Sequence, residues 1–147
     1  MKLPVHVVIS AAVSGGLYSV SGSREAAVSC FLCGVFIDLD HLVDYILVSD
    51  GKLSINDFFD WCHQVRWNKI YLFLHSYELF LAVSVYAFFS ASPLWYGITL
   101  GTGFHLLADQ LGNKRMERGY FMNKAFYFLI FRFRSGFLKE KLLGRAR

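Results

Sequence analysis

Residues 34–44, Gly-Val-Phe-Ile-Asp-Leu-Asp-His-Leu-Val-Asp, place four ionisable side chains inside an otherwise apolar run of membrane-spanning length. A charged side chain within a hydrophobic helix costs at least about 2.5 kcal/mol, so such residues usually pair, line a wet cavity or bind a cation. On a helix Asp38 shares a face with His41, and Asp40 shares a face with Asp44. Imidazole and carboxylate together are ligands for zinc, manganese or iron, and both also serve as general bases. The alternative is a helix that leaves the membrane near Asp38 and carries a solvated acidic end.

Further histidines lie in the other apolar runs of the chain. His75 precedes Glu78 by three residues and His105 precedes Asp109 by four, so each pair can point to one side of a helix. A lone buried histidine is more often a hydrogen-bonded core residue than a ligand, but several at one depth favour a metal site. The predicted ligands, from all four apolar runs, are His6, Asp38, Asp40, His41, His75, His105 and Asp109. A histidine that binds a metal usually donates a hydrogen bond from its other ring N–H to a carboxylate. Some of these aspartates are therefore expected only to orient imidazoles.

Five more residues have functional and structural interpretations. Glu78 or Asp44 is the predicted general base of a reaction at the metal. His63 could cap the site, although a solvated position on an interfacial helix is the simpler interpretation. Cys30-x-x-Cys33 has the spacing of a redox or metal motif, but inside an apolar helix next to a glycine, small packing residues are the favoured interpretation.

The composition indicates a single-domain membrane protein. Of the 147 residues 55% are hydrophobic and 18% aromatic, against roughly 45–50% apolar residues in a soluble domain. The net charge is +4, but most basic residues follow Gly112, which argues against nucleic acid as the partner. Three cysteines do not match the framework of a disulfide-stabilised secreted protein.

Four apolar runs are long enough to cross a bilayer, which needs roughly twenty helical residues. We predict spans at about residues 3–20, 25–48, 70–90 and 94–111. A cleaved signal peptide is the alternative for the first run, but the run is longer than is usual and contains His6. Close helix packing is predicted at two sets of small residues, Ala11, Ala12, Gly15 and Gly16 in the first run and Gly97-x-x-x-Gly101 in the fourth.

Two segments have the pattern of helices that lie on the membrane surface. Residues 54–67 are amphipathic and begin with Ser54-x-x-Asp57, which has the form of a capping box. Residues 120–134 are apolar but contain Lys124 and Arg132 and are too short to span. The predicted fold is therefore an all-α membrane protein, a four-helix transmembrane bundle with one or two interfacial amphipathic helices.

The basic residues predict the orientation of the chain. With four spans, fourteen of the fifteen Lys and Arg residues fall on one side and Arg24 alone on the other. The positive-inside rule then makes both termini cytoplasmic and places the His and Asp residues at the cytoplasmic leaflet. The basic tail, with aromatic residues beside Lys114, Arg115, Arg118, Lys124, Arg132 and Arg134, is predicted to bind anionic lipid headgroups, or simply to anchor the orientation.

The pattern resembles the predicted membrane-bound metal-dependent hydrolases of bacteria, a family that includes a LexA-regulated inner-membrane member. The matching pieces, between about residues 5 and 113, are His6, Asp38-Leu-Asp40-His41, His75-Ser76 and His105-Leu-Leu-Ala-Asp109. More distantly, the helical His and Asp pattern is similar to zinc-dependent phospholipase C and the P1-type nucleases. The resemblance implies a bacterial inner-membrane enzyme that uses clustered metal ions, zinc above all, to cleave phosphate esters.

We therefore expect a membrane-embedded hydrolase with one or two divalent ions, zinc or else manganese or iron, that acts at the cytoplasmic face on a phosphate ester or lipid-type substrate. The first alternative is a non-catalytic membrane protein that binds or conducts metal ions or protons through the same cluster. The second is a membrane-anchored structural or interaction protein that acts through its basic tail.

Overall fold

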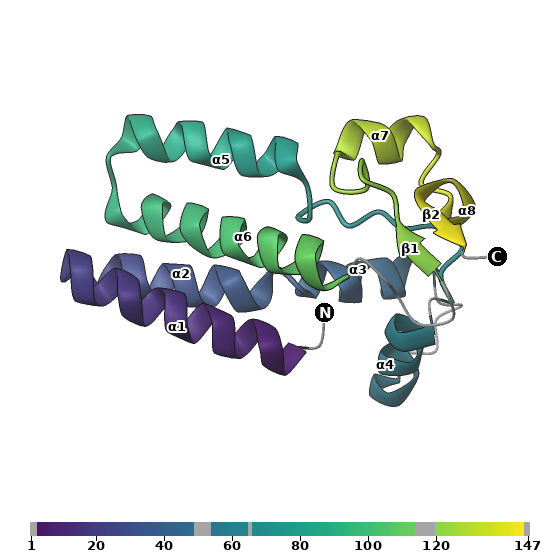
Figure 1. Cartoon of the computed structure of the whole chain (residues 1–147), viewed down its shortest axis with the longest axis horizontal. Coiled ribbons are helices and arrows are strands. Elements are labelled where there is room, and N and C mark those ends of the chain that lie inside the picture. The colour runs from purple at the N-terminus through teal and green to yellow at the C-terminus, as the bar shows by residue number, and fades with distance from the viewer. Residues whose placement is uncertain (1–2, 49–53, 65, 114–119, 146–147) are drawn as a thin grey trace. The chain divides into compact units, whose positions relative to one another are not determined.

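A computed structural model describes residues 3–48, 54–64, 66–113 and 120–145 (Figure 1). Where the sequence predicts one domain, the backbone divides into two compact units. The first comprises Met1–Ile37 and Glu78–Gly112, and the second comprises Asp38–Tyr77 and Asn113–Arg147. The described chain is mostly helical, as predicted, with one short pair of strands.

The first unit is a group of helices that run alongside one another (Figure 1). They are α1 (Leu3–Ser21), α2 (Arg24–Phe36), α5 (Tyr77–Ser90) and α6 (Pro93–Gly112). Gly22, with φ of 65°, ends α1, and the Ser23 side chain caps α2 by accepting the Ala26 N–H at 3.2 Å.

Helix α2 packs against α6 through the predicted Gly-x-x-x-Gly motif. A Cβ at Gly97 would collide with Ser29 and the Ala26 carbonyl, and a Cβ at Gly101 would collide with the Cys30 carbonyl. The absence of side chains therefore lets the two helix backbones touch. The Ser29 hydroxyl adds a hydrogen bond of 3.1 Å to the Leu94 carbonyl.

The small residues of α1 have a different environment from the one predicted. Nothing lies within 4 Å of a Cβ built on Gly15 or Gly16, and Ala11 and Ala12 are exposed. In the part of the chain that the structure describes, this stripe takes no part in helix packing. The outward faces of the unit are strongly apolar, with Val20 90% and Phe89 79% exposed, which is typical of a lipid-facing surface.

Two helical stretches among the described residues are long and apolar enough to cross a membrane. They are Pro4–Ser21 and Arg24–Val48, the second interrupted by a turn at residues 37 and 38. The third predicted span, 70–90, is helical only from Tyr77, which leaves α5 at 14 residues. The fourth predicted span, 94–111, coincides with α6, but α6 is not one of the two stretches that are long and apolar enough to cross a membrane. A four-span bundle with cytoplasmic termini stays a prediction.

The second unit contains short elements. They are α3 (Leu39–Val48), α4 (Ile55–Gln64), β1 (Tyr120–Met122), α7 (Leu129–Arg134), α8 (Lys139–Leu142) and β2 (Leu143–Arg145). β1 pairs antiparallel with β2, with Phe121 opposite Gly144. Helix α4 confirms the core of the helix predicted at 54–67, and Ser54 accepts the Asp57 N–H at 3.5 Å, as the capping box requires.

The tail differs from the helix predicted over residues 120–134. It begins with β1, turns through residues 123–127 and is helical only in α7. Arg132, predicted to lie on the membrane surface, is fully buried. A strand that pairs with residues more than twenty positions later leaves no local periodicity, so an apolar run with two cations has the pattern of a surface helix.

The tail is hydrogen-bonded along segment 66–76, which connects the end of α4 to the start of α5 and contains no helix. Lys139 N–H donates to the Asn68 carbonyl at 3.0 Å, Ile70 N–H to Phe137 at 2.9 Å, and Tyr77 N–H to Tyr127 at 2.9 Å. Two stretches far apart in sequence thus hold each other in place through backbone hydrogen bonds.

Candidate metal sites

The first unit brings together His6 from α1 with His105 and Asp109 from α6, and we call these three residues the first cluster. His6 Nε2 lies 3.1 Å from Asp109 Oδ1, and His105 Nε2 lies 3.6 Å from Asp109 Oδ2. The two imidazole rings are stacked at 4.0 Å, with 16° between their planes. All three residues are at most 3% exposed. Their ligand atoms lie within 4.8 Å of one another, close enough for one ion.

The tautomer of His105 follows from a backbone contact. Its Nδ1 lies 2.8 Å from the carbonyl oxygen of Gly34, which only accepts hydrogen bonds, so Nδ1 carries the proton. In a neutral imidazole Nε2 then presents its lone pair, and here it faces a carboxylate oxygen of Asp109. Two acceptors that face each other need a cation between them.

The cation at the first cluster can be a proton or a metal ion. One extra proton would make His105 an imidazolium paired with Asp109, whereas protonation of both imidazoles, stacked at 4.0 Å, would make them repel each other. A divalent ion is compatible with two neutral imidazoles and one carboxylate. A histidine whose other N–H is bound by a backbone carbonyl is the usual arrangement around zinc. The residues of the first cluster therefore fit a metal ion.

The second unit brings together Asp38, His41 and His75, which we call the second cluster. Asp38 Oδ1 lies 3.5 Å from His75 Nε2 and 3.8 Å from His41 Nε2. The three ligand atoms again lie within 4.8 Å of one another. His75 is 1% exposed, whereas Asp38 and His41 are partly open. The buried Trp67 ring stacks on His41 at 5.3 Å, which limits the rotation of that imidazole.

Asp40 lies behind the second cluster and orients His75. Its Oδ2 is 3.3 Å from His75 Nδ1 and also accepts the backbone N–H of Leu74 at 2.6 Å. A proton on Nδ1 donated to this carboxylate leaves the Nε2 lone pair directed at Asp38. This is the carboxylate–histidine–metal arrangement, so Asp40, one of the predicted ligands, is placed as an orienting residue.

The two predicted general bases have different surroundings. Asp44 is completely buried, and its two carboxylate oxygens accept the backbone N–H groups of Tyr71 at 2.8 Å and Leu72 at 3.2 Å. These bonds give Asp44 a role in holding the backbone. Glu78 is half-buried in the first turn of α5. Its spacing from His75 does not place the two on one helical face, because His75 precedes the helix.

The remaining predicted residues lie outside both clusters or outside the described side chains. Cys30 and Cys33 are free thiols on α2, Cys30 being fully buried, as expected of a packing residue. Burial and the nearby charges of Asp38 and Asp44 raise the pKa of Cys62 to about 12, so without a bound metal ion this residue is a thiol at neutral pH. The side chain of His63 lies outside the described part of the structure.

Sequence reasoning missed three contributors to these sites, which are the Gly34 carbonyl, Trp67 and Arg132. A backbone carbonyl and a stacked ring leave no local pattern in a sequence. Arg132 left little signal, because an arginine is mostly exposed and is fully buried only when it is paired. Comparisons with protein-family models, with curated proteins and with solved structures found no match to this chain.

Proposed function

We propose that the protein is a metal-dependent hydrolase of the bacterial inner membrane, with one divalent ion, zinc in the first instance, at each cluster. The observation that carries the proposal is the contact of His105 Nδ1 with the Gly34 carbonyl oxygen at 2.8 Å. This contact fixes the tautomer of His105 and turns its Nε2 lone pair toward a buried carboxylate oxygen of Asp109. The Asp40–His75 pair gives the same arrangement in the second unit. Each cluster has three protein ligands, which is the number that catalytic zinc sites use when one position stays open for water or substrate.

A bound divalent ion supplies Lewis acidity, which activates water and polarises a phosphoryl oxygen. The protein residues fix that chemistry in place. The two carboxylate oxygens of Asp109 face the Nε2 atoms of His6 and His105, and Asp40 fixes the tautomer of His75. Of the two predicted general bases, Asp44 already accepts backbone N–H groups with both carboxylate oxygens. Glu78 is therefore the proposed proton acceptor of the reaction.

The proposed substrate is a phosphate ester of a membrane lipid, reached from the cytoplasmic leaflet, with both termini on that side. Two membrane-length apolar stretches and the exposed apolar faces of the first unit support a membrane location. The partly open side of Asp38 and His41 supports access of substrate to the second cluster.

Hydrolysis is tested with detergent-purified protein, stripped with EDTA and reloaded with zinc or manganese, on a soluble phosphomonoester and on phospholipids. Release of phosphate or of the headgroup is expected to return with metal and to fall at least a hundredfold in Asp109→Asn, which removes a ligand charge. Asp60→Asn is the matched control, because Asp60 is an exposed carboxylate of α4. Metal binding without turnover of any such ester would instead favour a non-catalytic protein that binds or conducts metal ions or protons through the same His and Asp residues.

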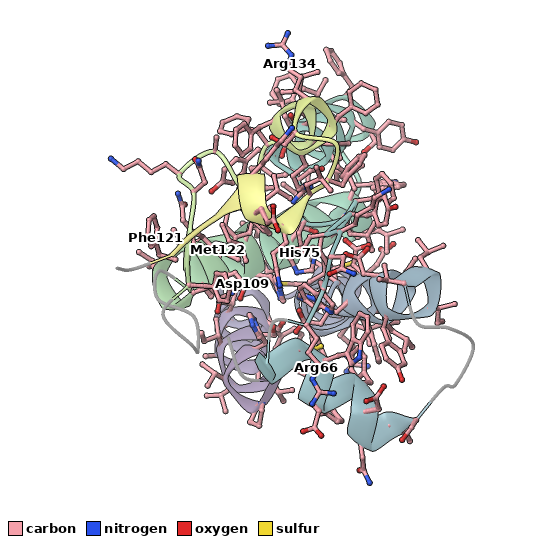
Figure 2. The ribbon with its side chains drawn as sticks, turned by 90° about the vertical axis from the view of Figure 1, so that its right-hand side faces the viewer. Arg66, His75, Asp109, Phe121, Met122 and Arg134 are labelled. Atoms are coloured by element: carbon pink, nitrogen blue, oxygen red, sulfur yellow. The ribbon has the colours of Figure 1, made fainter. Side chains whose placement is uncertain are left out.

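We further propose anionic lipid as the partner of the exposed bases of the tail. Arg134 extends away from the ribbon (Figure 2), and Phe133 beside it is 68% exposed. Lys124 is exposed as well. Arg132 is excluded because it is buried, and Lys114, Arg115 and Arg118 lie outside the described residues.

Neutralising Lys124 and Arg134 together to glutamine is expected to weaken binding of fluorescent phosphatidylglycerol by about 2 kcal/mol, or roughly thirtyfold, at low salt. Binding of phosphatidylcholine in the same detergent should be unchanged, and high salt should reproduce the loss. Arg24→Gln, at an exposed base near the start of α2, is the control. Equal affinities in the double variant and the wild type would leave these bases with orientation as their role.

A further inference from the structure

Segment 71–75 carries His75 to the second cluster without any regular secondary structure to support it. Leu72 has a φ of 44°, a left-handed conformation that costs a non-glycine residue free energy and persists only where the surroundings enforce it. The question is which groups enforce it.

Two carboxylates of α3 hold the N–H groups of this segment. Asp44 accepts from Tyr71 and Leu72, and Asp40 accepts from Leu74 and His75, at distances between 2.6 and 3.3 Å. Asp40 and Asp44 are four residues apart, so one face of α3 presents both carboxylates along the segment. Both are at most 3% exposed.

One guanidinium holds the carbonyl groups of the same segment. Arg132 Nη2 donates to the Leu72 carbonyl at 2.9 Å, and Nη1 donates to the His75 carbonyl at 3.0 Å and to the Phe126 carbonyl at 3.2 Å. Among the basic residues whose side chains are described, Arg132 is the fully buried one. A buried cation is costly unless its donors are satisfied and opposite charge is near, and Asp44 supplies such charge.

His75 is therefore fixed on three sides. Its N–H and its ring Nδ1 meet Asp40, and its carbonyl meets Arg132. The remaining polar atom, Nε2, is turned toward Asp38. The planar fork of arginine suits this task, because it can reach two carbonyls of the segment and a third on the tail at once.

We propose that Arg132 is a positioning residue for His75, through which the C-terminal tail sets the geometry of the second cluster. This inference rests on the proposed metal binding at that cluster. It assigns the tail a function separate from its contact with lipid, since Arg132 touches the backbone of the ligand-bearing segment and not the ligand atoms.

The test compares Arg132→Gln and Arg132→Lys with Arg134→Gln, a neighbour on α7 that is exposed. Three measurements are made on the full-length protein in detergent. Hydrogen exchange of the metal-free protein reports the protection of the backbone N–H groups of residues 66–77. Nitrogen-15 spectra report which ring nitrogen of His75 carries the proton. A cobalt titration followed by visible absorption reports the affinity for cobalt.

We expect Arg132→Gln to speed exchange of residues 71–75 at least tenfold, to mix the two tautomers of His75 and to weaken cobalt binding at least tenfold. Arg132→Lys, which keeps the charge but not the fork, should fall between that variant and the wild type. Arg134→Gln should change none of the three. Unchanged exchange of α1, α2 and α6 would show that the variants are folded.

A different pattern overturns the proposal. If His75 keeps one tautomer and cobalt binds equally well in Arg132→Gln, the arginine does not position the ligand, even if the melting temperature falls. Faster exchange throughout the chain in both Arg132 variants would also overturn it, because the arginine would then support the whole fold. A wild-type protein that binds no cobalt would refute the metal proposal, while the exchange and tautomer measurements would still decide the role of Arg132.

Discussion

Purified wild-type protein is expected to contain tightly bound zinc or another divalent transition metal, and replacement of His105 or His75 by alanine is expected to remove much of it. Each of these imidazoles is buried, has its Nδ1 bound by an acceptor and turns its Nε2 toward an aspartate. Loss of one of three protein ligands should weaken binding by more than the roughly 10–100-fold that is typical of losing an orienting partner. Asp40→Asn, which alters such a partner, should fall within that range.

Elemental analysis of the detergent-purified protein gives the metal content, and competition with a chromophoric chelator gives the affinity. Asp60→Asn should match the wild type, because an exposed carboxylate of α4 contributes to neither measurement. Less than a tenth of an equivalent of transition metal in the wild type, with no gain after addition of zinc or manganese, would contradict the proposal.

The clusters show what local spacing can predict and what it cannot. The His105–Asp109 pair follows from the backbone geometry of one helical turn, and Asp38 lies in the turn that leads directly into α3 and His41, so counting residues was enough to find both pairs. The partners of Asp40 and Asp44 lie about thirty residues away on an irregular segment. No periodicity encodes such contacts, because they depend on how the chain folds back on α3.

The same reasoning explains the errors in the predicted elements. His75 and Glu78 have helical spacing, but α5 begins only at Tyr77, since segment 70–76 gives its backbone hydrogen bonds to α3 and the tail. In the tail, the pairing of β1 with β2 is also nonlocal. The cap predicted at Ser54 is present, because such a cap is determined by a few neighbouring residues.

Alanine at Gly97 or Gly101 is expected to destabilise the first unit by about 1–3 kcal/mol, the usual cost of forcing extra volume into a packed contact. Each new methyl group would collide with a backbone carbonyl of α2, at Ala26 and Cys30 respectively, and a backbone cannot rotate away as a side chain can. Leucine at either position should be worse. Gly101 lies one turn before His105, so its substitution should also displace that imidazole from Gly34 and lower the metal content.

The matched control for this interface is Gly15→Ala. A Cβ at Gly15 has nothing within 4 Å, and alanine is favoured over glycine in a helix interior by about 1 kcal/mol, so this variant should be as stable as the wild type or more so. The midpoint of unfolding in detergent, followed by circular dichroism, compares the variants. If Gly97→Ala and Gly101→Ala unfold at the same midpoint as Gly15→Ala, then α2 and α6 are not in backbone contact. The hydrogen bond from His105 on α6 to the Gly34 carbonyl on α2 depends on that contact, so it would then be absent as well.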